Sequence, residues 1–119
     1  MPDIPAATQA QDRTDTEIAT ALVALGERFN REVEEPVRNA LQAQMKALAQ
    51  SRADLRALEL RRILDSEAIA EALRILARTD QELQKEVRRL KDAVKAVDRA
   101  VKIVGQVEKA VGQLVKLLP

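Results

Sequence analysis

The side chains that most often perform catalysis are scarce in this sequence. It contains no His and no Cys, and its serines are limited to Ser51 and Ser66, so the familiar pairs of nucleophile and base cannot be assembled. Glu32, Glu34 and Glu35 form a local carboxylate cluster. The cluster lacks the Glu-x-x-His pairs that build di-metal sites in four-helix proteins, and a solvated helix surface explains it. We therefore expect no enzymatic activity, no metal and no cofactor.

The most regular chemical feature is a basic row near the carboxy terminus. Its members recur every seven residues: Arg88, Lys95, Lys102, Lys109 and Lys116. Residues 85–119 carry 9 basic and 4 acidic side chains, whereas residues 1–84 carry 11 basic and 15 acidic ones. Lysines beside an apolar stripe commonly solubilise it, and contact with an anionic membrane surface is the alternative interpretation. Nucleic acid is not expected as a partner, because Phe29 is the sole aromatic side chain that could stack on a base.

Long amphipathic helices must carry these residues. From Leu73 to Leu118 apolar side chains recur at alternating steps of three and four, interrupted by Asp80 and Glu108, which is the pattern of helix–helix packing. A second apolar face at helical spacing precedes it. Apolar residues make up 46% of the chain but aromatic residues only 1%, a composition typical of packed helices. We expect an all-α fold.

A single helical-hairpin domain is predicted over residues 14–119, after a flexible amino-terminal arm at residues 1–13. Thr14 opens a capping-box sequence, so the first helix is predicted over residues 14–64. Pro36 falls inside it and removes one backbone hydrogen bond. A kink there is preferred to a break into two helices, because the apolar face continues unshifted.

The second helix of the hairpin is predicted over residues 67–118, after a turn at residues 64–67. Asp65 or Ser66 can accept a hydrogen bond at its amino terminus. A rival capping box begins at Thr79 and would make the segment before it a separate short helix.

The turn position predicts which residues pair across the hairpin. If the helices turn near residue 65, residues at the same level have numbers that sum to about 131. This register brings apolar residues together and places Arg52 level with Asp80, which predicts a polar pair. The predicted coiled-coil-like intramolecular seam contains Leu41, Met45, Leu48, Leu55, Leu58, Leu73, Leu76, Leu83, Val87, Leu90 and Val94.

A two-helix hairpin covers each apolar side chain from one side only, so further apolar residues remain for a partner. These predicted interface residues are Leu60, Ile63, Ile75, Ile103, Val107, Leu114 and Leu117. A homodimer that completes a four-helix bundle is the simplest assembly, and another helical protein is the other choice of partner.

The predicted function is that of a non-enzymatic helical scaffold or interaction protein, which self-associates or binds a partner helix through apolar stripes. The alternative is a peripheral membrane-surface protein that binds anionic lipid through its carboxy-terminal basic amphipathic helix. No apolar run approaches the roughly 20 residues that span a bilayer, and the start of the chain shows no secretory signal. A cytoplasmic location is expected, with membrane association under the alternative.

Overall fold

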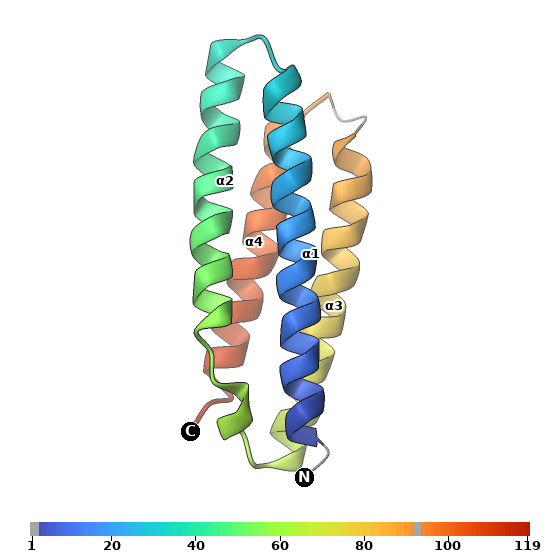
Figure 1. The fold of residues 1–119 in the computed structure, drawn as a ribbon, viewed down its shortest axis with the longest axis vertical. Coiled ribbons are helices and arrows are strands. Elements are labelled where there is room, and N and C mark those ends of the chain that lie inside the picture. Colours follow the sequence, from blue (N-terminus) through green and yellow to red (C-terminus); the bar gives the residue numbers. More distant parts are fainter. Residues whose placement is uncertain (1–2, 92–93) are drawn as a thin grey trace.

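Four α-helices lie side by side in the computed structural model, which describes residues 3–91 and 94–119 (Figure 1). They are α1 (Asp3–Arg31), α2 (Glu35–Arg56), α3 (Ser66–Leu90) and α4 (Ala96–Val115), with a 3-10 turn, η1 (Leu60–Arg62), between α2 and α3. No strand occurs in the described residues. The bundle measures 51 × 21 × 16 Å. The all-α prediction is confirmed, and one chain supplies all four helices.

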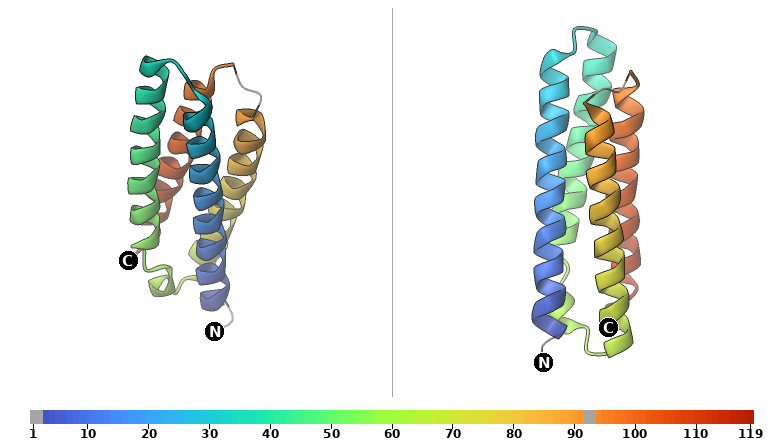
Figure 2. Two further views of the ribbon diagram at one scale, coloured as in Figure 1. Left: turned by 45° about the horizontal axis from the view of Figure 1, so that its top comes forward. Right: turned by 90° about the vertical axis from the view of Figure 1, so that its right-hand side faces the viewer.

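The helices occupy the corners of a square in the order α1, α2, α4, α3. α1 packs against α2 and α3, and α4 packs against the same two helices from the opposite corner. Consecutive helices run in opposite directions, so α1 and α3 are parallel neighbours (Figure 2). α2 and α3 lie diagonally across the core, and η1 crosses the end of the bundle to connect them.

Pro36 starts a helix instead of kinking one. α1 ends at Arg31, and α2 begins at Glu35 with Pro36 in its first turn. A helix amide in the first turn has no intrahelical acceptor, so proline loses nothing there and its fixed φ suits the helix. The predicted continuous helix at residues 14–64 is therefore wrong, and the break that was the second choice is correct.

The first helix also begins earlier than predicted. α1 starts at Asp3, so most of the predicted flexible arm is helical; residues 1 and 2 lie outside the described part of the chain. Ala7 and Ala10 are buried in the core, which explains why this segment is held in place. Thr14 does not cap a helix, because it lies inside α1 and is fully buried.

Asp65 is the N-cap of α3. Its carboxylate accepts a hydrogen bond from the amide of Ala68 at 2.9 Å, and the helix begins one residue before the predicted start at residue 67. Thr79 lies inside α3, where its hydroxyl donates to the carbonyl of Ile75 at 2.7 Å, so it does not start a helix.

The second predicted helix is two helices. α3 ends at Leu90 and α4 begins at Ala96, in a stretch without glycine or proline; residues 92 and 93 lie outside the described part. Reversal of the chain here brings α4 back along α2 and α3, where its apolar face is buried. Tertiary burial therefore overrides the local helical pattern.

The predicted seam is part of a common four-helix core. Leu41, Leu48, Leu55, Leu76, Leu83 and Leu90 are buried, and Met45, Leu58, Leu73 and Val87 are partly buried. Val94 is the exception, since it is 96% exposed in the segment before α4. The seam residues of α2 and α3 do not form one interface between adjacent helices, because these two helices lie diagonally across the core.

The residues predicted to form an oligomer interface also lie inside the chain. Leu60, Ile63, Ile75, Ile103, Val107 and Leu114 are buried, and Leu117 is partly buried against them. One chain therefore buries the apolar residues that were predicted to contact a second copy. Any partner surface must be sought among other residues.

Candidate functional site

The contacts between α1 and α2 replace the predicted pair of Arg52 and Asp80. Arg52 donates from Nε to Oδ1 of Asp15 at 2.7 Å and from Nη2 to Oδ2 at 3.2 Å. This hydrogen-bonded pair lowers the pKa of Asp15, against the opposing effect of burial. Asp80 accepts instead from the hydroxyl of Thr14 at 2.6 Å. The predicted polar pair is wrong because α1 supplies a partner to each of its members.

Two further polar side chains form contacts at the two ends of the antiparallel pair α1 and α2. Arg38 stacks over Phe29, with its guanidinium carbon 4.0 Å from the ring centroid, and donates to the carbonyls of Phe29 and Glu32 at 2.9 and 3.0 Å. At the other end, the buried amide of Gln11 donates to the carbonyls of Leu55 and Leu58, both at 2.8 Å. These contacts add side-chain donors to carbonyls at the ends of α1 and α2 that lack a full set of helical hydrogen bonds. They were not predicted, because each depends on the packing of separate helices.

A buried carboxylate joins α3 to α4. Glu86 is 5% exposed, and its Oε2 lies 3.3 Å from Nη1 of Arg99 on α4 and its Oε1 lies 3.8 Å from Nη1 of Arg89. Burial of a charged group requires such partners. The pair fixes α4 against α3 and was also missed in the sequence.

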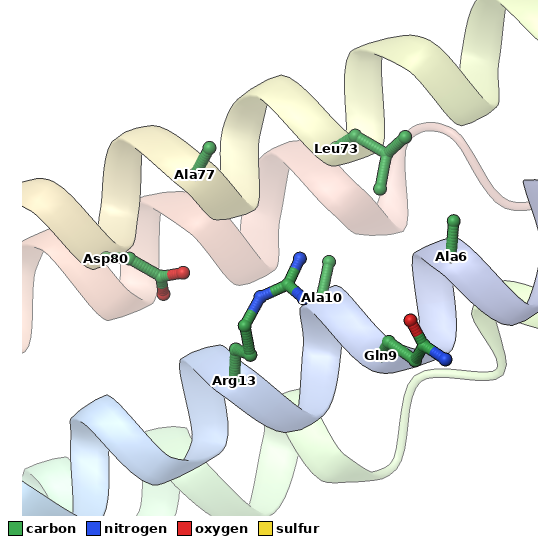
Figure 3. Close-up of a pocket in the computed structure, with 7 residues that line it drawn as sticks. All are labelled: Ala6, Gln9, Ala10, Arg13, Leu73, Ala77 and Asp80. Carbon is green, nitrogen blue, oxygen red and sulfur yellow. The ribbon is translucent and has the colours of Figure 1, made fainter.

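A groove of about 410 Å³ runs between the parallel helices α1 and α3. Figure 3 shows its lining residues, with alanines and a leucine around one part and the side chains of Arg13 and Asp80 at one end. An adjoining hollow of about 320 Å³ shares Arg13 and Asp80 and adds Asp12, Thr16, Glu17 and Gln84. Together the two hollows combine an apolar part with a polar part.

Asp80 lies where the two hollows meet. Burial raises its pKa, the hydrogen bond from Thr14 opposes this rise, and the negative charge of Glu17 adds to it. Glu17 is itself held by Gln84, whose amide nitrogen lies 3.1 Å from its Oε1. Among the residues that the structure describes, none forms an ion pair with Asp80 within 4.0 Å, and Arg13 acts on its charge from a longer range.

The outer face of α4 is the second candidate surface. At about 100° per residue, Gly105 and Gly112 lie at the centre of this face, with Val101 and Val115 along one edge. Both valines are 49% exposed. A Cβ atom added at either glycine would meet nothing within 4 Å, and no glycine among the described residues has a positive φ. Packing within the chain therefore does not require glycine at these positions.

Four members of the predicted basic row follow the other edge of the same face: Lys95 at the start of α4, and Lys102, Lys109 and Lys116 along it, all exposed. Arg88 is also exposed but belongs to α3, so the predicted row of five is not on one helix. Asp98 and Glu108 are also exposed on this face, so the surface is mixed in charge. We call the surface formed by Val101, Gly105, Gly112 and Val115, with its lysine border, the α4 outer face.

The residues considered for catalysis are dispersed. Ser51 is buried in α2 and Ser66 is the first residue of α3. Glu32 pairs with Arg28 at 3.2 Å. Within residues 3–91 and 94–119, no group of three or more His, Cys, Asp or Glu side chains could hold a metal ion. None of the helices in the described part is both long enough and apolar enough to cross a membrane.

Comparison of this chain with protein-family models, with characterised proteins and with solved structures finds no match.

Proposed function

We propose that this protein is a non-enzymatic helical interaction protein whose α4 outer face binds another helix, with a second copy of the chain as the first-choice partner. The observation that carries the proposal is that two exposed glycines, Gly105 and Gly112, lie between the exposed Val101 and Val115. Packing within the chain would accept a Cβ atom at either glycine. Small side chains at the centre of a helix face allow another helix to approach closely. The residues predicted to form the oligomer interface are covered within the chain, so a partner helix would contact the outer face of α4 instead.

Glycine in the interior of a helix destabilises it by about 0.5 to 1 kcal/mol relative to alanine. α4 contains two such residues on one face. A contact that forms only when a partner binds explains why this cost is tolerated, since a methyl group at either position would hold the partner's backbone away.

The length of α4 limits the affinity. Its 20 residues extend about 30 Å, so a contact made by this helix alone is smaller than the standard interface of about 1,200 to 2,000 Å². We therefore expect a dimer with a dissociation constant in the micromolar range, or a transient complex with another helical protein.

The mass in solution tests the proposal. Light scattering across a concentration series up to about 100 µM should show a salt-resistant dimer or larger species. Val101→Glu together with Val115→Glu should convert it to a monomer, because it removes both exposed valines and adds two negative charges beside that of Glu108. Ala49→Glu with Ala53→Glu is the matched control, since both alanines are exposed on α2.

A monomer at every concentration would remove the self-association form of the proposal. The partner-helix form is tested by placing a photo-crosslinking side chain at Val101 or at Ala49 in cells of the source organism. Crosslinks at Val101 but not at Ala49 support it, and equal or absent crosslinks at the two positions reject it.

Binding to an anionic membrane surface is the second candidate, favoured by the exposure of Lys95, Lys102, Lys109 and Lys116 along one helix. Lysines beside exposed valines could meet lipid headgroups while the valines enter the interface. Co-sedimentation with vesicles containing phosphatidylserine tests this candidate. It fails if all four lysines can become glutamine without loss of binding, or if the protein does not co-sediment. A cytoplasmic location belongs to the first proposal and a membrane-associated one to the second.

A further inference from the structure

The groove between α1 and α3 has two chemically different parts. The apolar part is walled by Ala6, Ala10, Leu73 and Ala77. The polar part, in the adjoining hollow, contains the carboxylates of Asp12, Glu17 and Asp80 and one cationic side chain, that of Arg13. A lining with three acidic groups and one basic group favours a cationic ligand, while the alanine walls favour a hydrocarbon chain.

Asp80 is the group around which such a ligand would be arranged. Its Oδ1 accepts from the Thr14 hydroxyl at 2.6 Å, which fixes the carboxylate between the two parts of the groove. The hydrogen bond comes from a neutral donor, and within the described part of the chain no cationic nitrogen lies within 4.0 Å of the Asp80 carboxylate. A partly buried carboxylate of this kind gains from a cation that reaches it along the groove.

We propose that the groove between α1 and α3 binds a linear alkylammonium ligand, with its ammonium group beside Asp80 and its hydrocarbon chain over Ala10, Leu73 and Ala77. The groove volume of about 410 Å³ falls within the range of small-molecule sites, about 300 to 1,000 Å³. Gln9 and Glu17 lie in the linings of the two hollows, one on each side of Arg13 in α1. This site is separate from the α4 outer face and does not depend on the proposed function.

Arg13 is the competing cation. It lines both hollows and is exposed, and in Figure 3 its guanidinium group lies beside Ala10, between that residue and Asp80. An arriving ammonium group must share the acidic end with this guanidinium or displace it. Removal of the Arg13 charge should therefore tighten binding of an amine and weaken binding of an anion.

Titration of the full chain with hexylammonium chloride, followed by amide NMR shifts, tests the site. We expect a dissociation constant of about 0.1 to 1 mM, typical of a ligand of this size, with shifts in α1 and α3 near Ala10 and Ala77. Hexanol and sodium hexanoate are the matched probes, identical in chain length but neutral and anionic. Each should bind at least about tenfold more weakly, because hexanol brings no positive charge to the Asp80 carboxylate and hexanoate is repelled by it.

Variants identify the residues responsible. Asp80→Asn keeps an acceptor for Thr14 and should weaken hexylammonium binding at least about tenfold, whereas Asp54→Asn, on the exposed surface of α2, should not change it. Ala77→Leu fills the apolar part from an exposed position and should weaken binding, while Arg13→Gln should tighten it about threefold.

Several results would overturn the proposal. Equal binding of hexanol and hexylammonium, unchanged binding by Asp80→Asn, or shifts that map away from α1 and α3 would each reject the site. Ala77→Leu keeps the test valid if Asp80→Asn alters the fold, because a solvent-facing alanine tolerates substitution. Charged substitutions at Val101 and Val115 should leave amine binding intact, so failure here and failure of the α4 proposal are recognised separately.

Discussion

Replacement of the two glycines of the α4 outer face with alanine should make the isolated chain more stable and its association weaker. Gly105 and Gly112 lie in the interior of α4 with open space where a Cβ atom would be. Each Gly→Ala change should then raise the free energy of unfolding by about 0.5 to 1 kcal/mol, chiefly by restricting the unfolded chain. For a chain of this length the double variant should melt about 4 to 8 °C higher.

The sign of the effect should depend on protein concentration. In dilute solution, where the chain is monomeric, the melting temperature should rise as calculated. Where the wild type associates, two added methyl groups at a close helix contact should cost about 1 to 3 kcal/mol, weakening the dimer roughly 5- to 150-fold. Thermal melts followed by circular dichroism, run beside light scattering at the same concentrations, measure both effects.

Gly26→Ala is the matched control for this experiment. Its added Cβ would lie 3.7 Å from the terminal methyl carbon of Met45, an ordinary van der Waals contact within the chain. It should raise the melting temperature at all concentrations and leave the mass unchanged. If Gly105→Ala fails to stabilise the dilute chain, α4 is not an exposed regular helix there. If it stabilises the chain without weakening association, the glycines are not at the contact.

Three further predictions concern the polar contacts between helices. A double-mutant cycle of Asp15→Asn and Arg52→Met should give a coupling energy of about 1 kcal/mol at pH 7, the size expected for a partly exposed bidentate pair. Because the pKa of Asp15 is lowered from 3.8, this coupling should persist above pH 3.8 and disappear as the pH falls through the lowered pKa. A coupling energy that does not change with pH would contradict the prediction. Asp80→Asn should be neutral or stabilising at pH 7, because the pKa of Asp80 is raised and its ionisation destabilises the fold as the pH rises; melts at pH 3 should show no such gain over the wild type. Arg99→Met should lower the free energy of unfolding by about 3 kcal/mol, because Glu86 stays buried beside the more distant Arg89. Urea unfolding should show that adding Glu86→Leu restores most of this loss.

Residues 31–36 show what local sequence rules can and cannot decide. Local rules identify Pro36 as a disturbance, but the same residue suits a kink, a break or the first turn of a new helix. The choice depends on whether α2 buries more apolar surface by reversing along α1 than by continuing α1 in a straight line. Arg38, which binds the carbonyls of Phe29 and Glu32, stabilises the reversal, and nothing in its sequence spacing indicates that contact.

The sequence between α3 and α4 carries no local signal for a break. It has no proline, no glycine and a continuous apolar repeat, so every local rule extends the helix through it. Reversal is favoured only because Ile103, Val107 and Leu114 become fully buried when α4 returns to the bundle. That gain belongs to the whole fold, and the predicted dimer was an alternative way to obtain the same burial.

The predicted register gives the correct level of Arg52 and Asp80 along the bundle but the wrong contacts for both. Arg52 binds Asp15 and Asp80 binds Thr14, and since Thr14 and Asp15 are consecutive, the predicted pair does lie at one level of the bundle. α2 and α3 are antiparallel, as in the hairpin, but they occupy opposite corners with α1 between them. An apolar repeat specifies which side of a helix faces the core and at what height each residue lies, but antiparallel helices at adjacent and diagonal corners satisfy it equally. Only the side chains at the edges of the apolar face distinguish the two arrangements, and here those side chains are on α1.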